Sequence, residues 1–146
     1  AGHAYNTGDP AYYNNTLIGS CDFSIQGGSV DAAFISITNF SIVPNNGNLT
    51  GEEYNIWAGD NVTKLGETIA QSEGYITSTN ANVNADGIYY TDMGEATYLS
   101  AFGDSGGPVY LTDSKKVIGI HKGSTAFTSI FVKVDNIASK LNAHFN

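Results

Sequence analysis

Gly103-Asp104-Ser105-Gly106-Gly107-Pro108 is the most informative run of residues in this chain. A serine sits among glycines, so little side chain shields its hydroxyl, and glycine permits backbone conformations that other residues resist. Two backbone N–H groups aimed at one point form an oxyanion hole, and we place them on Gly103 and Ser105. A turn or a flexible loop is the alternative for a glycine-rich run. The order of these six residues, with the apolar Val109-Tyr110-Leu111 after them, favours a nucleophile loop.

The run from Gly103 to Pro108 resembles the nucleophile motif of chymotrypsin-like serine proteases, which carry a histidine and then an aspartate upstream of the serine. Asp31-Ala32-Ala33-Phe34-Ile35 resembles their aspartate segment, an acid at the head of an apolar strand. Ala1-Gly2-His3-Ala4 resembles their histidine segment, in which small residues flank the base. The resemblance implies a serine-type endopeptidase with a triad of His3, Asp31 and Ser105.

Alternatives exist for two members of this triad. His3 lies near the start of the sequence, where a histidine is usually a solvated residue. Asp31 has the alternative role of a turn or cap residue. Asp22 ranks second as the triad acid, because no apolar strand follows it directly.

Composition narrows the class of partner. The net charge is -8, with six lysines and no arginine, which argues against nucleic acid. No segment approaches the roughly 20 apolar residues of a membrane span. Cys21 is the only cysteine, so an internal disulfide is impossible, and we interpret it as a small hydrophobic residue. We expect no metal, no cofactor and a monomer, and the protease resemblance implies protein or peptide substrates.

The chain is predicted to be all-β, because its 17 glycines and many Asn, Ser and Thr residues suit short strands joined by turns. The resemblance implies a chymotrypsin-like double β-barrel with a C-terminal helix. No strand fits before His3, so we expect an incomplete first barrel and a chain that lacks its front portion. Turn-forming residues gather in Pro44–Asn48. We therefore expect residues 1–45 to be the remaining part of the N-terminal barrel and residues 46–146 the C-terminal barrel.

The expected strands are Thr16–Gly19, Cys21–Ile25, Ala33–Thr38, Tyr54–Ala58, Lys64–Gln71, Gly74–Asn84, Ile88–Thr91, Val109–Thr112, Val117–His121 and Thr128–Val134. Asp135 is a natural helix N-cap. Ile137, Leu141 and Phe145 recur every four residues, which predicts a helix with one apolar stripe that packs on the second barrel. His144 is expected at the surface.

Two further segments refine the resemblance. Ser72–Ser78 resembles a strand of streptogrisin-like bacterial proteases, and Val117–Ser124 resembles the pocket wall of glutamyl endopeptidases. The second likeness implies that His121 is the principal donor to a substrate carboxylate, with hydroxyls from Ser124 and Ser100, and hence a preference for Glu at P1. A buried carboxylate needs hydrogen-bond donors, and charge-assisted ones are strongest. The alternative is a strand histidine in a neutral pocket.

Two positions depart from the pattern of these relatives. Phe102 stands where some of them carry a serine. Lys122 replaces the serine that many of them use to support the triad aspartate. Together with the expected loss of the front portion, Lys122 favours the competing hypothesis of a catalytically inactive protease-like binding or cell-wall protein. The presence of His3, Asp31 and Ser105 opposes that hypothesis.

A hydrolase with a nucleophile elbow is a poor alternative. The pattern Gly-x-Ser-x-Gly is formally present, but that class places its histidine after the serine and needs alternating helices. The protease likeness implies a secreted protein. Four Asn-x-Ser/Thr sites, at Asn14, Asn39, Asn48 and Asn61, permit glycosylation.

Overall fold

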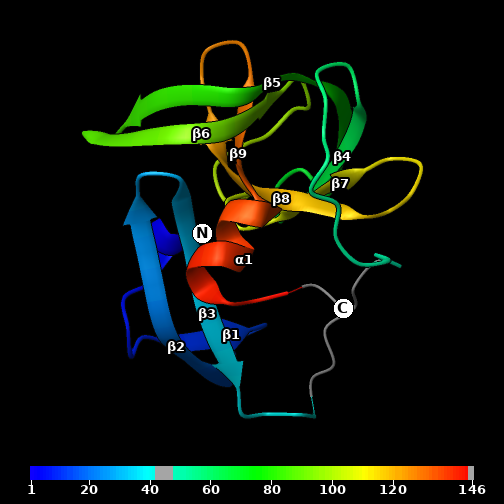
Figure 1. Ribbon diagram of the computed structural model, residues 1–146. Coiled ribbons are helices and arrows are strands. Elements are labelled where there is room, and N and C mark those ends of the chain that lie inside the picture. The colour runs from blue at the N-terminus through cyan, green and yellow to red at the C-terminus, as the bar shows by residue number, and fades with distance from the viewer. Residues whose placement is uncertain (42–47, 145–146) are drawn as a thin grey trace.

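The computed structural model describes residues 1–41 and 48–144 (Figure 1). The expected boundary between residues 45 and 46 and most of the turn-forming cluster lie outside the described residues. Phe145, the last member of the expected helix stripe, lies outside them too.

Strands dominate the described residues. A short 3-10 helix, η1 (Gly2–Ala4), precedes them, and one α-helix, α1 (Val134–Leu141), follows them. The strands are β1 (Pro10–Tyr13), β2 (Thr16–Gly27), β3 (Val30–Ile37), β4 (Asn61–Leu65), β5 (Gln71–Ala85), β6 (Ile88–Ala96), β7 (Pro108–Leu111), β8 (Val117–Ser124) and β9 (Ser129–Lys133). The predicted all-β class with a C-terminal helix is confirmed.

The strands form two sheets. β1, β2 and β3 make a three-stranded antiparallel sheet, in the part of the chain where the first barrel is expected. The other six strands close into an antiparallel barrel in the order β4-β5-β6-β9-β8-β7. Each of these six strands therefore has a partner on both sides within the barrel, and the outer part of the β5–β6 hairpin extends beyond the segments that pair with β4 and β9. Figure 1 shows the barrel above the three-stranded sheet, with α1 against both.

The strands expected over Thr16–Gly19 and Cys21–Ile25 are one strand, β2, and the strand expected over Ile88–Thr91 continues to Ala96. Three further differences from the expected elements have a local reason. Tyr54–Ala58 is not a strand. The Trp57 N–H donates to Asp60 Oδ2 at 2.8 Å and the Asp60 N–H donates to the Trp57 carbonyl at 3.1 Å, which makes a turn. The strand expected over Lys64–Gln71 ends at Leu65, because the N–H groups of Thr68 and Ile69 donate to the buried carboxylate of Asp104 instead of to a partner strand.

The third difference concerns the start of α1. Lys133 is the N-cap, and Asp135 lies in the first turn. Its carboxylate accepts from the Asn136 N–H at 2.9 Å, at the end of the helix where a negative charge is favourable. His144 is exposed, as expected, and its Nδ1 lies 2.9 Å from Glu52 Oε1.

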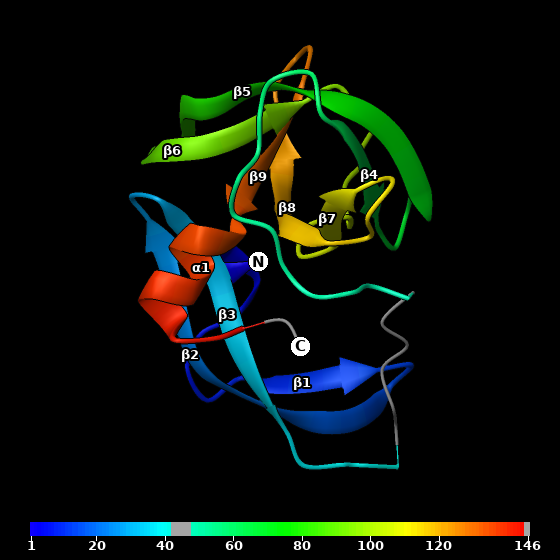
Figure 2. The same cartoon turned by 45° about the vertical axis from the view of Figure 1, so that its right-hand side comes forward.

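Two clusters of buried apolar side chains form the core. One fills the barrel and includes Val62, Ile76, Val109, Ile118 and Phe131. The other joins Val30 and Ala32 of β3 to barrel residues of β6 and β9 and to Ile137 of α1. α1 therefore packs on the three-stranded sheet as well as on the barrel (Figure 2). This shared core fixes β3 relative to the barrel, and η1 is held in turn by its contacts with β2 and β3. None of the helices among the described residues is long and apolar enough to cross a membrane.

Candidate active site

A histidine and a buried aspartate pair at the start of the chain. Asp31 Oδ1 accepts the backbone N–H of His3 at 2.8 Å, and its Oδ2 lies 2.7 Å from His3 Nδ1. Because a carboxylate only accepts, Nδ1 carries the hydrogen and Nε2 keeps a free lone pair. Burial by itself would raise the pKa of Asp31, but hydrogen bonds from His3 and Lys122 outweigh it and hold the pKa below its usual value.

Gly2 explains how η1 reaches this position. A Cβ at Gly2 would stand 2.2 Å from the Ile25 carbonyl oxygen and 2.8 Å from the Ala32 nitrogen, so only glycine fits between β2 and β3. Ser24 Oγ donates to the Gly2 carbonyl at 3.0 Å. The small residue before His3 therefore lets the 3-10 turn sit directly on β3, next to Asp31.

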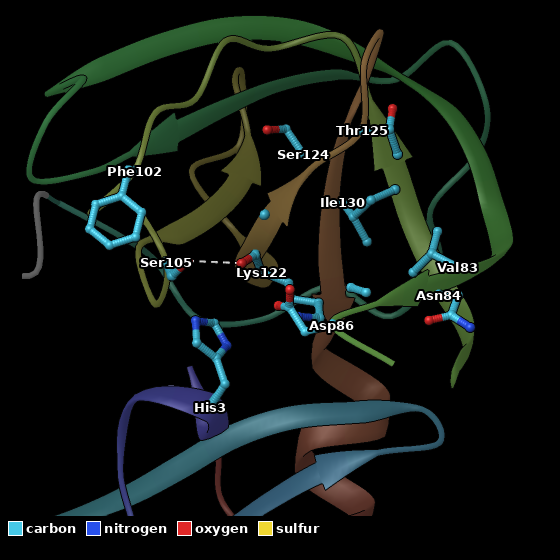
Figure 3. A pocket seen from close by; sticks show the side chains of 12 residues that line it. His3, Val83, Asn84, Asp86, Phe102, Ser105, Lys122, Ser124, Thr125 and Ile130 are labelled. Carbon is cyan, nitrogen blue, oxygen red and sulfur yellow. Dashed lines mark hydrogen bonds between the residues drawn. The ribbon is translucent and has the colours of Figure 1, made fainter. Parts of the chain in front are cut away.

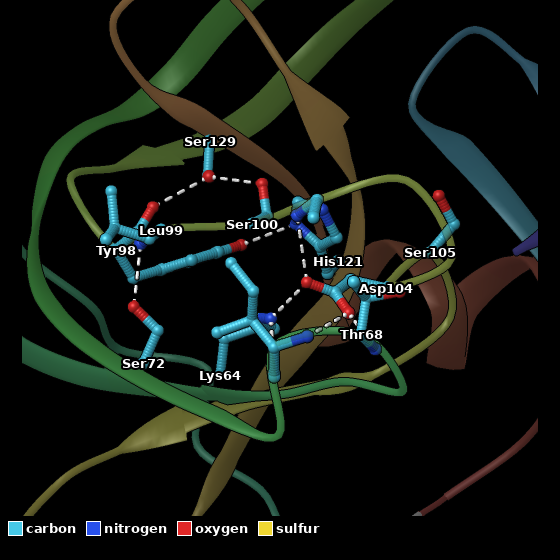
Figure 4. Close-up of polar contacts among 12 residues, drawn as sticks. Lys64, Thr68, Ser72, Tyr98, Leu99, Ser100, Asp104, Ser105, His121 and Ser129 are labelled. Carbon is cyan, nitrogen blue, oxygen red and sulfur yellow. Dashed lines mark hydrogen bonds and ion pairs between the residues drawn. The ribbon is translucent and has the colours of Figure 1, made fainter.

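The loop between β6 and β7 carries Ser105. Gly103 and Gly106 have φ angles of 100° and 96°, which favour glycine. Between them Asp104 is buried, and its Oδ2 lies 2.6 Å from the Nζ of Lys64, which has no exposed side-chain surface (Figure 4). Backbone N–H groups of Thr68, Ile69 and Ala101 also donate to this carboxylate.

Lys64 is the partner of Asp104 that the sequence did not identify. The only local signal was a lysine in an apolar strand. Burial would raise the pKa of Asp104, but Lys64 and the backbone donors outweigh it and hold that pKa well below its usual range. The ion pair therefore anchors the residue before Ser105 to β4.

Ser105 and His3 line one pocket of about 560 Å³, together with Phe102, Lys122 and Ser124 among others. Figure 3 shows the imidazole of His3 facing Ser105 across this pocket. The Ser105 hydroxyl donates to the carbonyl of Lys122 at 2.8 Å. Since a hydroxyl has one proton to donate, it must rotate to another staggered position before it can donate to His3.

The expected oxyanion-hole donors lie on the same loop. Among the hydrogen bonds of the described residues, none is donated by the backbone N–H of Gly103 or of Ser105. Thr68 Oγ1 donates to the Phe102 carbonyl at 2.7 Å. Because the C=O and N–H of a trans peptide point in opposite directions, this bond turns the Gly103 N–H away from Thr68.

His121 lies behind the surface rather than in a pocket wall. It is 1% exposed, and its Nδ1 is 3.0 Å from the hydroxyl of Tyr98. Burial lowers the pKa of His121 to about 4, with the charge of Lys64 as a further cause. Burial also raises the pKa of Tyr98 well above its usual value. We therefore assign the phenol as the donor, which leaves the hydrogen of a neutral His121 on Nε2. No sequence pattern pointed to Tyr98.

Ser100 and Ser124 line a second, smaller pocket of about 210 Å³, with Phe127 and Ser129. Ser129 Oγ donates to the Tyr98 carbonyl at 2.8 Å, so Ser100 Oγ, 2.9 Å away, donates to Ser129. Ser124 is exposed and lines both pockets. The structure thus brings Ser100 and Ser124 together, while His121 lines neither pocket.

Two remaining expectations concern acids and metals. Asp22, the second candidate for the triad acid, accepts a hydrogen bond from Ser36 on an exposed face of the sheet, whereas Asp31 is the acid beside His3. Within residues 1–41 and 48–144, no group of three or more His, Cys, Asp and Glu side chains could hold a metal ion. Cys21 is buried.

Comparison with known proteins identifies a relative for part of the sequence. No family model matches the chain. A segment of 72 residues is 39% identical to glutamyl endopeptidase 2 of Streptomyces griseus; it covers 49% of this chain and 37% of that protein.

Solved structures match over nearly the whole chain. Thermobifida fusca protease A has a TM-score of 0.80 and 25% identity, over 97% of this chain and 79% of that one. Nocardiopsis protease has a TM-score of 0.82 and 21% identity, over 97% and 80%. A glutamic acid-specific serine protease, described as using a histidine triad in substrate binding, has a TM-score of 0.80 and 23% identity, over 99% and 83%. The chain has the chymotrypsin-like double-barrel fold of these proteins.

Proposed function

Because this chain is a relative of the chymotrypsin-like serine proteases, we propose that it is a serine endopeptidase that cleaves peptide bonds through an acyl-enzyme. The observation that carries the proposal is the contact of 2.7 Å between His3 Nδ1 and the buried Asp31, with His3 and Ser105 on the same pocket. A serine hydroxyl is a weak nucleophile until a base takes its proton, and an imidazole held by a carboxylate is such a base.

The proposed steps follow from these positions. The Ser105 hydroxyl leaves the Lys122 carbonyl and turns to His3, whose Nε2 takes the proton as Oγ attacks the substrate carbonyl carbon. Asp31 stabilises the imidazolium through Nδ1. His3 then protonates the leaving amine. In the second half of the reaction, a water molecule gives a proton to His3 Nε2 as its oxygen attacks the acyl carbon, and His3 returns that proton to the Ser105 oxygen as the acyl product leaves.

The N–H groups of Gly103 and Ser105 are the proposed donors to the developing oxyanion. Two features of the loop support this role: neither N–H is used within the described residues, and the Phe102 carbonyl is held by Thr68 on the opposite side of its peptide. The loss of one such donor costs about 3–4 kcal/mol of transition-state stabilisation.

We further propose that the substrate carries an acidic residue, preferentially Glu, at P1. The segment likeness to glutamyl endopeptidase 2 supports this preference, as does the exposed hydroxyl of Ser124 in the smaller pocket. Ser100 lines the same pocket, and its hydroxyl would have to turn from Ser129 before it could donate to a substrate carboxylate. Burial and the charges of Lys64 and Lys122 lower the pKa of His121 and outweigh the opposite effect of Asp104, so the ring is disfavoured as an imidazolium. The proposed donor at His121 is therefore the Nε2–H of a neutral ring, which a modest rearrangement of the pocket wall must uncover.

The remaining proposals concern context. Residues 1–45 would be the remaining part of an N-terminal barrel and residues 46–146 a C-terminal barrel with its helix, as the separate sheet and closed barrel support. We infer a secreted monomer that acts on proteins or peptides.

The first experiment asks whether Ser105 is activated. The purified chain is treated with a fluorophosphonate probe, which labels only an activated serine, and compared with Ser105→Ala and with Ser139→Ala on α1. Label and peptidase turnover should be present in the wild type and Ser139→Ala and absent in Ser105→Ala, with unchanged circular dichroism. A folded wild-type chain that neither labels nor cleaves would favour the inactive binding protein instead.

The second experiment tests P1 preference with a panel of peptides that differ only at P1. Cleavage after Glu, and more weakly after Asp, is expected, and Ser124→Ala should lower kcat/KM for the Glu peptide about tenfold, as for the loss of one hydrogen bond to a charged group. Ser139→Ala is the matched control. Cleavage mainly after Phe, Leu or Arg would contradict the acidic preference without contradicting the protease.

A further inference from the structure

A buried lysine contacts the carboxylate that pairs with His3. Lys122 on β8 is 8% exposed, and its Nζ lies 3.0 Å from Asp31 Oδ2. The same oxygen is 2.7 Å from His3 Nδ1, so the ammonium and the imidazole share one acceptor. On another side, the Nζ lies 4.4 Å from the centroid of the Tyr90 ring.

These contacts explain how an ammonium group remains in such a place. An isolated charge in the interior is costly, and it persists where an opposite charge or an aromatic face compensates it. Asp31 supplies the charge and Tyr90 the face. The Lys122 ammonium is thus held in place by Asp31 and Tyr90, and it is not a solvated side chain.

A lysine at this place differs in kind from a hydroxyl. A serine would donate a hydrogen bond to Asp31 and leave its full negative charge to the imidazole. An ammonium donates a hydrogen bond and also brings a positive charge close to His3, which opposes protonation of the ring. The carboxylate is therefore fixed by both, and its charge is divided between two cations when His3 is protonated.

The other charged groups around this site come from different elements. The amino group of Ala1 lies near Asp31 and Lys122, and its pKa is lowered, mainly by burial. Asp86, at the turn between β5 and β6, lines the same pocket as His3. Lys122 is the cation in direct contact with Asp31, and so it is the main source of positive charge on this side of the His3 ring.

We propose that Lys122 is a positioning residue of the triad, which holds Asp31 and shares its charge so that His3 acts as a base in more acidic solution than a neutral residue at position 122 would allow. The proposal rests on the proposed serine protease function. Lys122 does not touch the reacting atoms with its side chain, and its role is exerted through Asp31.

The test compares the pH dependence of kcat/KM for the wild type, Lys122→Met, Lys122→Ser and Lys122→Arg. The acid limb should move up by about one pH unit in the Met and Ser variants, because a neighbouring cation is lost, and stay close to wild type in Lys122→Arg. Lys116→Met, which breaks the surface pair with Glu53, is the control and should leave the profile unchanged. An acid limb in Lys122→Met and Lys122→Ser that coincides with wild type overturns the proposal.

A second measurement tests the role of Lys122 independently of the proposed protease function. The His3 ring resonances are followed by NMR against pH in the same variants, each combined with Ser105→Ala to prevent self-cleavage. Their midpoint should rise by about one pH unit without the lysine, whether or not the wild type is a protease. Absence of peptidase activity with a shifted midpoint would overturn only the catalytic role, whereas an unshifted midpoint overturns the sharing of charge. If Lys122→Met does not fold, Lys122→Ser decides by the same criterion.

Discussion

Replacement of Lys64 by methionine should destabilise the fold more than any surface charge does. The change removes the ammonium from the buried pair with Asp104 and keeps an unbranched apolar side chain. The two charged atoms are 2.6 Å apart and neither side chain is exposed. At an effective dielectric constant of about 20, such a pair attracts by about 6 kcal/mol, most of which offsets desolvation of the two groups.

Removal of one partner leaves the other charge buried, which typically costs about 3–5 kcal/mol. Three backbone N–H groups still bind the Asp104 carboxylate, so we expect about 3 kcal/mol. For a domain of this size, that loss lowers the melting temperature by about 10 °C.

Urea unfolding at pH 7, followed by circular dichroism, measures the loss. Lys116→Met is the matched control, because its pair with Glu53 is 43% and 24% exposed and should contribute less than about 1 kcal/mol. The double variant Lys64→Met/Asp104→Asn should lose less than the sum of the single variants, since it leaves no buried charge.

The pH dependence provides a second check. A carboxyl whose pKa is lowered by folding contributes stability above its unfolded pKa, and that stability is lost as pH falls toward the folded value. Without Lys64 the pKa of Asp104 must rise, so the variant takes up a proton in mildly acidic solution. The gap between wild type and variant should therefore narrow from pH 7 to pH 4.5. A loss at pH 7 no larger than that of Lys116→Met would refute this account of the pair.

Two further predictions concern the core. The pKa of His121 is about 4 in the fold and higher in the unfolded chain, so the unfolded chain binds more protons between these values and stability should fall by about 3 kcal/mol from pH 6.5 to pH 4. In a plot of melting temperature against pH, the wild type should fall between pH 6.5 and pH 4, and His121→Gln should lose most of that fall. If the variant falls as steeply as the wild type, other groups cause the pH dependence. Ile118→Ala should cost about 2–5 kcal/mol in urea unfolding, because Ile118 is fully buried, whereas Leu17→Ala, at 51% exposure, should cost well under 1 kcal/mol. Equal losses would mean that the barrel core does not carry the stability.

Much of the fold could be predicted because its signals are local. Short segments between turn-forming residues located most of the strands, and the apolar stripe of Ile137 and Leu141 located α1. The wrong strand at Tyr54–Ala58 shows the limit, since a hydrogen bond between Trp57 and Asp60 outweighed the strand propensity of the segment. Turn chemistry of this kind depends on which side chain faces which N–H, and apolar patterning does not record it.

In the candidate site, too, residues with a local sequence signal could be predicted, and residues without one could not. The residues nominated for the chemistry, His3, Asp31 and Ser105, each sit in a short segment with its own recognisable composition. The residues that hold them do not: Lys64 meets Asp104 across 40 positions of sequence, and Tyr98 meets His121 across 23. Their partners are set by strand pairing in the barrel, so neither a motif nor a spacing could identify them.

The amino-acid sequence by itself determined that this chain forms strands with a terminal helix, and that a serine on a glycine-rich loop is its strongest candidate for chemistry. Only the tertiary structure decided that Asp31 rather than Asp22 lies beside His3, that a lysine shares this carboxylate, and that His121 is buried and neutral. The physical reason is that charge and protonation depend on distance and burial, and both are set by segments remote along the chain that the shared core of β3, the barrel and α1 brings together.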